Sequence, residues 1–420
     1  MHSRALFACF LLGPIALFLV STVRPAAAAP TLPNGGVILG SLPIIGAEDD
    51  YEFTAGLGDH IELRMASSDP LYPEIELRDP NGAIVGTGSD CCVSGVEHTV
   101  VDPGTFGVTV RDGLGNRVGD YQLYFTRIPG ANELGALLNG PVNQETIDPG
   151  DLDTYTFVAN VGDHITLRSG RASGDLYPEL KLYDPLGVLL VQGSDALDTS
   201  VESTAALPGI YTLQVASGLL RNSGDYDLHF ARIPGTVENG ALVDGLTYPG
   251  ELTLGDLDTF VFSANVGDNI TLDLVLLTGD FYSSIELYTP SGVLADSSTV
   301  AGTASVAHQT TESGLYTVLV QDGLGRRTGT YSLAFTSDGT PTVPTMTVPL
   351  LALLSGILAA SVPVSNWIRR RQPTLARATE SPRAEPSRAG APSIQVHRLA
   401  RVPNVRSCDL KDQAGHSQSL

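Results

Sequence analysis

Apolar and polar residues alternate between Asp151 and Leu167 in the manner of two short β-strands. Tyr155 and Phe157 alternate with threonines, a Gly-Asp pair then supplies a turn, and apolar residues resume the alternation after it. This period-2 pattern predicts a half-buried β-hairpin, with one face of each strand directed into a core.

The same pattern occurs three times in the chain. It recurs about 104 residues earlier, at 50–63, and about 105 residues later, at 258–272. That spacing exceeds the period of solenoid repeats and matches the size of a small β-sandwich. The chain is therefore predicted to contain three copies of one domain, at 32–130, 131–235 and 236–338.

Each copy is predicted to form roughly eight short strands, because turn signals recur about every 8 to 12 residues. Pro-Gly and Asp-Pro-x-Gly sequences supply several of these turns. The alternating aromatic and aliphatic residues of two sheets would form each core. Since the connections between copies are only a few residues long, we expect an all-β rod of three domains.

The order of motifs in each copy resembles that of bacterial pre-peptidase C-terminal domains. The motifs span most of 35–337 and are, in order, Asp-x-Asp-x-Tyr-x-Phe, Gly-Asp-x-Ile, Leu-Tyr-Asp-Pro-x-Gly, Gly-x-Tyr-x-Leu-x-Val and Gly-x-Tyr-x-Leu. The resemblance implies three tandem jelly-roll-like β-sandwich domains that serve as non-catalytic accessory or adhesion modules. Some members of that family bind calcium, and others bind protein or polysaccharide fibres.

Residues 1–28 have the features of a signal peptide for export. A weakly positive start precedes an apolar run, and a stretch of alanines follows with the small-residue pattern of a cleavage site after Ala28. An uncleaved N-terminal membrane anchor is the alternative. Both interpretations place the three repeats outside the cell.

The C-terminal part of the chain is predicted to cross a membrane once. After a Pro/Thr linker at 339–347, residues 348–368 form an uncharged apolar segment of about 20 residues, long enough for a transmembrane helix. Three arginines at 369–371 mark the cytoplasmic side. The basic tail at 369–420 is rich in Ala, Pro, Ser and Arg and is predicted to be disordered.

This Pro-Thr motif, apolar helix and arginine cluster resemble the tripartite sorting signals (IPTL/PEP-CTERM type) of bacterial surface proteins. In those proteins a membrane-embedded peptidase removes the tail. Those signals end within a few residues of the arginines, whereas this chain continues to Leu420. The prediction is a single-pass protein of the cell envelope or outer surface with a cytoplasmic tail, and removal of that tail stays open.

The net charge is −22, and basic residues gather near the two ends of the chain. The three repeats together therefore have a net charge of about −30. Such a surface repels nucleic acid and anionic lipid, so nucleic-acid binding is excluded as the function of the repeats. The same surface attracts divalent cations and basic partners.

Acidic residues gather before the aromatic strand of every copy. They are Glu48-Asp49-Asp50, then Asp148 with Asp151 and Asp153, then Glu251 with Asp256 and Asp258. Several carboxylates beside backbone carbonyls suit calcium, which takes about six to eight oxygen ligands. Acidic residues also favour turns through their own backbone hydrogen bonds. Calcium sites and solvated turn residues stay as alternatives, and calcium is the one cofactor that the sequence suggests.

The histidines and serines that recur do not form a catalytic pattern. His60 and His164 share one position, where the third copy has Asn269. Gly-Ser-Asp occurs at 88–90 and 193–195, and the third copy aligns there with Asp296-Ser297-Ser298. The chain has no His-x-x-x-His, Cys-x-x-Cys or Gly-x-Ser-x-Gly motif. We therefore assign no catalytic, cofactor-binding or metal-ligating residue and expect no enzyme.

A loop tyrosine recurs in all three copies, as Tyr72, Tyr177 and Tyr282. Exposed tyrosines bind sugars and proteins, whereas buried ones would plug one end of the sandwich, and both alternatives stay open. The adjacent Cys91 and Cys92 lie in a loop of the first copy only. They are either two small loop residues or a strained vicinal disulfide.

These observations predict a non-catalytic exported cell-surface protein that presents three binding or adhesion modules. Its expected partners are the membrane, through 348–368, and an extracellular protein or polysaccharide. The alternative is an accessory subunit, or a remnant, of a secreted hydrolase or protease system.

Overall fold

The computed structural model describes residues 28–67, 70–235 and 237–339. Twenty-four strands occur in this part of the chain and form six four-stranded antiparallel sheets. These residues contain no helix, so the predicted all-β fold is confirmed for them, and no membrane-spanning helix is found among them. The predicted membrane span at 348–368 and the tail at 369–420 lie outside the described residues, as does the signal peptide apart from Ala28.

The first domain is a sandwich of two sheets with jelly-roll connectivity. One sheet has the strand order β1-β8-β3-β6 and the other has the order β2-β7-β4-β5, so the chain crosses between the sheets at every connection except the one from β4 to β5. The strands are β1 (Gly36–Leu42), β2 (Glu48–Ala55), β3 (His60–Ala66), β4 (Pro73–Arg78), β5 (Ile84–Ser89), β6 (Val93–Thr99), β7 (Gly104–Asp112) and β8 (Gly119–Ile128).

The second domain repeats this connectivity, with the sheets β14-β11-β16-β9 and β10-β15-β12-β13. Its strands are β9 (Asn143–Ile147), β10 (Leu152–Ala159), β11 (His164–Arg171), β12 (Pro178–Tyr183), β13 (Leu189–Ser194), β14 (Asp198–Thr204), β15 (Gly209–Ser217) and β16 (Gly224–Ile233).

The third domain has the sheets β17-β24-β19-β22 and β18-β23-β20-β21. Its strands are β17 (Thr247–Leu252), β18 (Leu257–Ala264), β19 (Asn269–Leu276), β20 (Tyr282–Tyr288), β21 (Leu294–Ala301), β22 (Thr303–Gln309), β23 (Gly314–Asp322) and β24 (Gly329–Ser337).

Each sandwich has its own apolar core between its two sheets. The aromatic residues of the predicted hairpin lie in that core. Phe157 contacts Phe230, with ring centroids 4.6 Å apart, and stacks on Tyr211 at 5.6 Å. Phe53 and Phe262 make equivalent contacts in the other two domains. Every second residue of a strand points inward, so the alternation of the sequence becomes the core.

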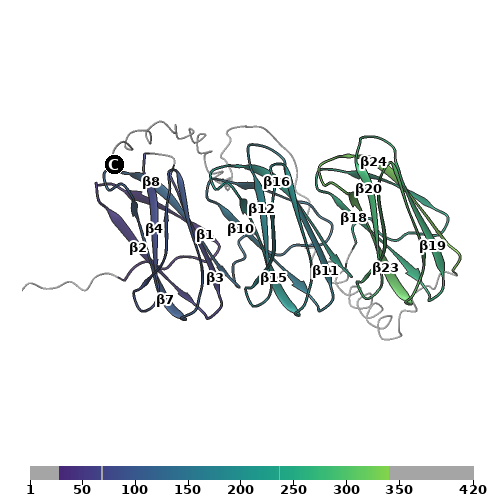
Figure 1. Ribbon diagram of the computed structural model, residues 1–420, viewed down its shortest axis with the longest axis horizontal. Coiled ribbons are helices and arrows are strands. Elements are labelled where there is room, and N and C mark those ends of the chain that lie inside the picture. The colour runs from purple at the N-terminus through teal and green to yellow at the C-terminus, as the bar shows by residue number, and fades with distance from the viewer. Residues whose placement is uncertain (1–27, 68–69, 236, 340–420) are drawn as a thin grey trace, which may run out of the picture.

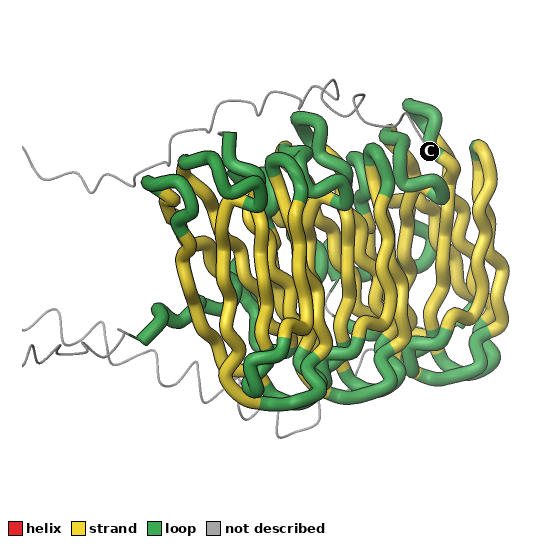
Figure 2. Tube along the Cα trace, turned by 60° about the vertical axis from the view of Figure 1, so that its left-hand side comes forward, coloured by secondary structure: helices red, strands yellow, loops and turns green. Residues whose placement is uncertain are grey.

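The three domains follow one another in a row (Figure 1). The sheet containing β3 faces the sheet containing β15 of the next domain, and β11 and β23 are placed in the same way at the second junction. Strands run side by side through the whole array, and the loops gather along two opposite sides of it (Figure 2). Loops of all three domains are therefore presented together.

Candidate functional sites at the domain junctions

A buried ionic cluster joins the first two domains. Glu62 and Arg64 on β3 form a salt bridge of 2.6 Å, and Lys181 on β12 reaches Glu62 at 3.1 Å. All three residues are almost fully buried. Burial opposes ionisation of Glu62, but Arg64 and Lys181 outweigh it and hold the pKa of Glu62 at about 2. Because losing one partner of a buried ion pair is costly, the cluster favours this one arrangement of the two domains.

The second junction reuses the position of Arg64. Arg64 Nη1 donates a hydrogen bond to the carbonyl of Ser217 at 3.4 Å, and Arg168 Nη1 donates one to the carbonyl of Asp322 at 2.8 Å. Arg168 has the same place in β11 as Arg64 in β3, and the two acceptors end the equivalent strands β15 and β23. The two junctions therefore share one docking geometry.

The recurring histidines belong to this docking surface. The ring of His60 packs on Tyr183 of the next domain, with centroids 5.1 Å apart, and His164 packs on Tyr288 at 4.9 Å. Burial lowers the pKa of both histidines and so favours the neutral ring. Asn269 has the same position in the third domain, after which the described residues contain no further sandwich. Among the described domains, histidine therefore occupies this position in the two that dock onto a following sandwich.

The Gly-Ser-Asp motif holds an arginine of the following domain. Asp90 accepts a hydrogen bond from Arg221 at 2.8 Å, and Asp195 accepts one from Arg326 at 2.5 Å. The strand register places Val300, and not Ser298, at this position in the third domain, which corrects the alignment made from the sequence. Domain docking therefore explains why the aspartate recurs in the first two copies alone.

The loop tyrosines lie half-buried at one end of each sandwich. The residue before each tyrosine, Leu71, Leu176 or Phe281, is buried and belongs to the core. Tyr282 is covered in part by Arg327, whose guanidinium carbon lies 5.1 Å from the ring centroid. The residue before the tyrosine closes the core, and part of each tyrosine ring stays accessible.

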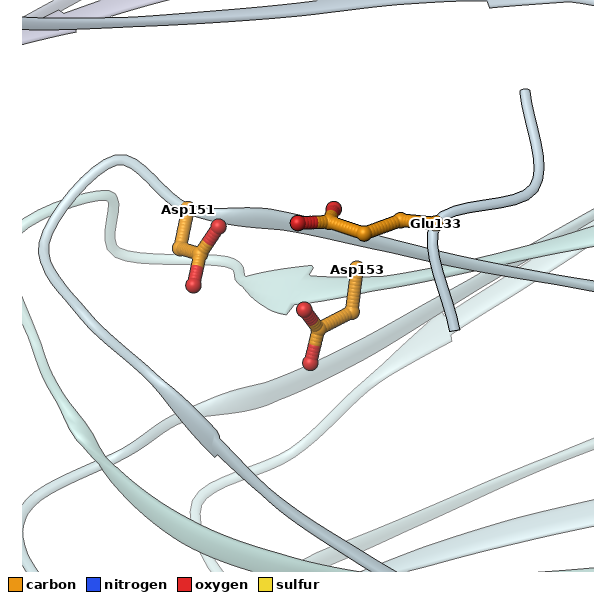
Figure 3. A group of neighbouring side chains, drawn as sticks. All are labelled: Glu133, Asp151 and Asp153. Carbon is orange, nitrogen blue, oxygen red and sulfur yellow. The ribbon is translucent and has the colours of Figure 1, made fainter. Parts of the chain in front are cut away.

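Three carboxylates meet at each junction, and we call these two groups the acidic trios. In the first trio, Glu133 of the linker meets Asp151 and Asp153 at the start of β10, with ligand oxygens within 4.8 Å of one another (Figure 3). The second trio consists of Glu238, Asp256 and Asp258. Both trios lie where a linker folds back onto the first long strand of the next sandwich.

The sequence located only part of each trio. It grouped Asp148 and Glu251 with the aspartates, but the structure brings in Glu133 and Glu238 instead. These glutamates belong to the linkers, so their position depends on how the linker folds. The available signal was their spacing of about 105 residues, which equals the repeat length. In the first domain Glu48 pairs with Arg111 at 3.5 Å.

Burial and mutual repulsion raise every pKa in the first trio. The pKa is about 7 for Glu133, about 6 for Asp151 and about 8 for Asp153. Near neutral pH the trio therefore keeps part of its protons, chiefly on Asp153, unless a cation neutralises it. A divalent cation would remove the repulsion between the carboxylates. Calcium takes about six to eight oxygen ligands, and the three carboxylates supply part of them. The residues of the trio thus fit a calcium ion.

The second trio has a histidine beside it. Burial and repulsion raise the pKa of Glu238 to about 7 and that of Asp258 to about 6. Burial would also raise the pKa of Asp256, but His229 outweighs this effect and lowers that pKa. His229 Nδ1 lies 3.4 Å from Asp256, and its ring is buried in the junction. The second trio therefore carries more negative charge at neutral pH than the first.

The fold and the junctions together define a stacked array of three jelly-roll modules. No family model matches the chain, and no curated protein sequence matches it. Among solved structures, the pre-peptidase C-terminal domain of a collagenase from Bacillus anthracis is 19% identical. The match covers 24% of this chain and 98% of that domain, with a TM-score of 0.22. That domain belongs to the family whose motifs the repeats resemble.

Two further structures are more distant. A triple jelly-roll protein from the turret of an archaeal virus is 13% identical over 72% of this chain and 90% of its own length, with a TM-score of 0.19. The CUB1-EGF-CUB2 fragment of rat MASP-1 is 10% identical over 47% of this chain and 99% of its own length, with a TM-score of 0.16. These similarities carry no functional conclusion.

Proposed function

We propose that the protein is a non-catalytic, exported cell-surface rod whose three modules bind an extracellular protein or polysaccharide. A recurring exposed aliphatic side chain carries this proposal. Leu57, Val161 and Val266 occupy the same place in the loop after the hairpin strand of each domain and are 73%, 63% and 64% exposed. Single exposed apolar residues are ordinary, but three at one repeated spacing suit a repetitive partner.

The junctions support this proposal because they hold the three loops at a fixed spacing. At the first junction Ala66, Val93 and Tyr124 pack with Leu152 and Ala216 of the next domain, around the buried ionic cluster. Domains joined by small polar contacts move independently, whereas an apolar junction restricts that motion. A stiff array loses little further entropy when its second and third modules bind.

Retention of the full chain on immobilised fibrous proteins and polysaccharides tests the binding proposal. Changing Leu57, Val161 and Val266 together to serine should lower retention by about tenfold or more, because three weak contacts act jointly. The matched control changes Leu114, Leu219 and Leu324, which are half-exposed on the opposite loops of the same domains. Loss of retention in the control alone would contradict the assigned surface.

We further propose that each acidic trio binds calcium. A trio joins a linker glutamate to two aspartates at the start of the next sandwich. A bound cation would tie the linker to the module and stiffen the junction. The raised pKa values support this assignment, since they record repulsion that a cation relieves.

The proposed location is the cell envelope, with residues 348–368 as the tether. Tags on either side of Val348, followed by cell fractionation and external protease treatment, test this. Both tags should stay with the membrane, and only the tag before Val348 should be cleaved. A cytosolic first tag would contradict export.

Hydrolase turnover that one substitution abolishes would contradict the non-catalytic proposal.

A further inference from the structure

A cavity of about 470 Å³ lies at the junction of the first two domains. Apolar side chains from both domains line it, among them Leu39, Tyr121 and Pro149. Two residues that line the cavity have reactive or charged side chains: Cys92 from the first domain and Arg221 from the second. Neither the docking of the domains nor the acidic trios explain this combination of a thiol and a guanidinium.

The loop that carries Cys92 has an unusual backbone. Cys92 has a φ of 74°, and the Val93 amide donates to the Cys91 carbonyl at 3.0 Å, which closes a three-residue turn. A positive φ is uncommon for a residue with a side chain and is favoured by glycine. The third domain has Gly302 at this position, with a φ of 100°. The first domain thus keeps cysteine at a site that suits glycine.

The backbone amide of Cys91 and the guanidinium of Arg221 meet at Asp90. Asp90 Oδ1 accepts hydrogen bonds from the Cys91 amide at 2.6 Å and from Arg221 at 2.8 Å. Burial lowers the pKa of Arg221, but Asp90 and the two thiols outweigh it and raise that pKa. Arg221 and the two thiols are therefore close enough to interact electrostatically. Both cysteines are half-buried.

We propose that Cys91 and Cys92 form a reversible thiol–disulfide exchange site that takes a small disulfide bearing carboxylates. Cys92 is the attacking residue because it lines the cavity, and Arg221 binds a carboxylate of the disulfide. Cys91 is then the second nucleophile, and the vicinal disulfide is the product. The homologous residues of the second domain, Ala196 and Leu197, cannot perform this chemistry.

The exchange is balanced in two steps. The Cys92 thiolate attacks one sulfur of the small disulfide, forms a mixed disulfide and releases one small thiolate. The Cys91 thiolate then attacks Cys92 Sγ, closes the vicinal disulfide and releases the second small thiolate. The protein loses two electrons and two thiol protons, and the small disulfide gains the electrons. The two protons pass through solvent to the released thiolates.

Oxidised glutathione, which is anionic, and cystamine, which is cationic, are the two probes. The reduced full chain is treated with each, and peptide mass mapping separates the Cys91–Cys92 peptide from Cys9 and Cys408. With glutathione disulfide the wild-type peptide should lose two hydrogens. Cys91→Ser should retain one glutathionyl group on Cys92, whereas Cys92→Ser should react roughly tenfold more slowly. Equal rates for the two serine variants would overturn the assigned roles.

Charge selection provides the second arm of the test. Arg221→Gln should slow reaction with oxidised glutathione roughly three- to tenfold and leave cystamine little changed, while Arg221→Lys should retain the preference. Arg326→Gln, the equivalent change at the junction without thiols, is the matched control and should alter neither rate. Asp120 also lines the cavity, and its carboxylate acts against this preference because it attracts cystamine and repels oxidised glutathione. Faster reaction of the wild type with cystamine than with glutathione disulfide would overturn the proposal of an anionic partner.

Discussion

One aspartate recurs in all three copies because it accepts a hydrogen bond from a buried tyrosine. Tyr121 donates to Asp49 at 2.6 Å, Tyr226 to Asp153 at 2.7 Å, and Tyr331 to Asp258 at 2.5 Å. In each case the tyrosine comes from the last strand of the domain and the aspartate from the hairpin strand. This residue has a structural role in every copy and joins an acidic trio in two of them.

Tyr226→Phe tests that structural role. The change removes the donor to Asp153 and a contact with Tyr155, whose hydroxyl lies 2.8 Å from that of Tyr226. We expect the free energy of unfolding of the second domain to fall by about 1–3 kcal/mol, measured by urea denaturation. Tyr177→Phe, in the half-buried loop, is the control and should cost less than about 0.5 kcal/mol. Equal losses would contradict the assignment.

Protonation of His60 and His164 should weaken the junctions in mild acid. Burial depresses both folded-state pKa values below the unfolded value of about 6.5 and outweighs the neighbouring glutamates, which act in the opposite direction. The stability that depends on the neutral rings is therefore complete above about pH 6.5. This stability is lost as the pH falls from about 6.5 toward the folded-state pKa of the histidines.

Changing both histidines to asparagine, the residue found at position 269, should remove this part of the pH dependence. Melting temperatures of wild type and variant, measured between about pH 5 and pH 7.5, should converge toward the acidic end. The asparagine side chain is neutral throughout, so the variant serves as its own reference for all other groups. Parallel curves would show that the histidines carry no such effect.

At the scale of elements, the acidic trios depend on the meeting of a linker and a strand. The folded-state pKa values of Glu133, Asp153, Glu238 and Asp258 are raised, so the folded chain favours their protonated forms. Without a cation, these groups make the fold less stable as the pH rises from about 4 to about 8. Calcium should reverse that loss by replacing the protons.

Thermal melting in calcium and in EDTA tests this expectation. Calcium should raise the melting temperature more at about pH 8 than at about pH 5.5, because fewer protons compete there. Glu133→Gln with Glu238→Gln should abolish most of the calcium response and, in EDTA at the higher pH, should melt above the wild type. Asp102→Asn, an exposed acid outside the trios, is the control. No calcium response at the higher pH would contradict the proposal.

Sequence periodicity was sufficient to predict the elements because it is local. Tyr155 and Phe157 alternate with threonines, and β10 and its partners in the other domains formed where that alternation predicted a strand. The trios were predicted only in part because Glu133 comes from outside any periodic segment. Its place beside Asp153 follows from the path of the linker, which alternation along a strand does not encode.

At the scale of the whole molecule, the end faces differ from the faces docked inside the array. On the outer sheet of the first domain, Arg111 pairs with Glu74 and Glu76 of its own domain, at 2.5 and 3.4 Å. Ala216 and Gln321 have the equivalent position in the other two domains. Arg111 thus satisfies carboxylates that an arginine of a preceding domain would otherwise contact.

The opposite end is closed to docking by a different change. Asp273 replaces the arginine that Arg64 and Arg168 provide at the two junctions. It would face the acidic sheet of another copy's first domain, so the two ends repel each other. Repeat proteins use polar terminal faces in this way to stop growth. The wild-type chain should therefore remain a single array.

Restoring the docking residues at both ends should produce head-to-tail association. Arg78 has the position in the first domain that Tyr183 and Tyr288 have in the other two. The variant therefore combines Asn269→His and Asp273→Arg with Arg78→Tyr and Arg111→Ala. Sedimentation velocity should show concentration-dependent growth of the particles at up to about 100 µM, since the contact forms in trans without a linker. Asp280→Arg, an exposed loop change with the same charge difference as Asp273→Arg, is the control. Association of the wild type would contradict the proposed incompatibility of its ends.

The sequence by itself determined the strands, the aromatic core and the number of copies. Each depends on residues that are close together in the chain, since alternation and turn chemistry act over a few positions. Only the tertiary structure decided how the copies meet. His60 meets Tyr183 and Asp90 meets Arg221 across more than 100 residues. Along the sequence, Asn269 and Val300 are irregularities in a repeat. In space they mark the end of the array, because a docking contact depends on the relative position of two folded domains, which no local pattern records.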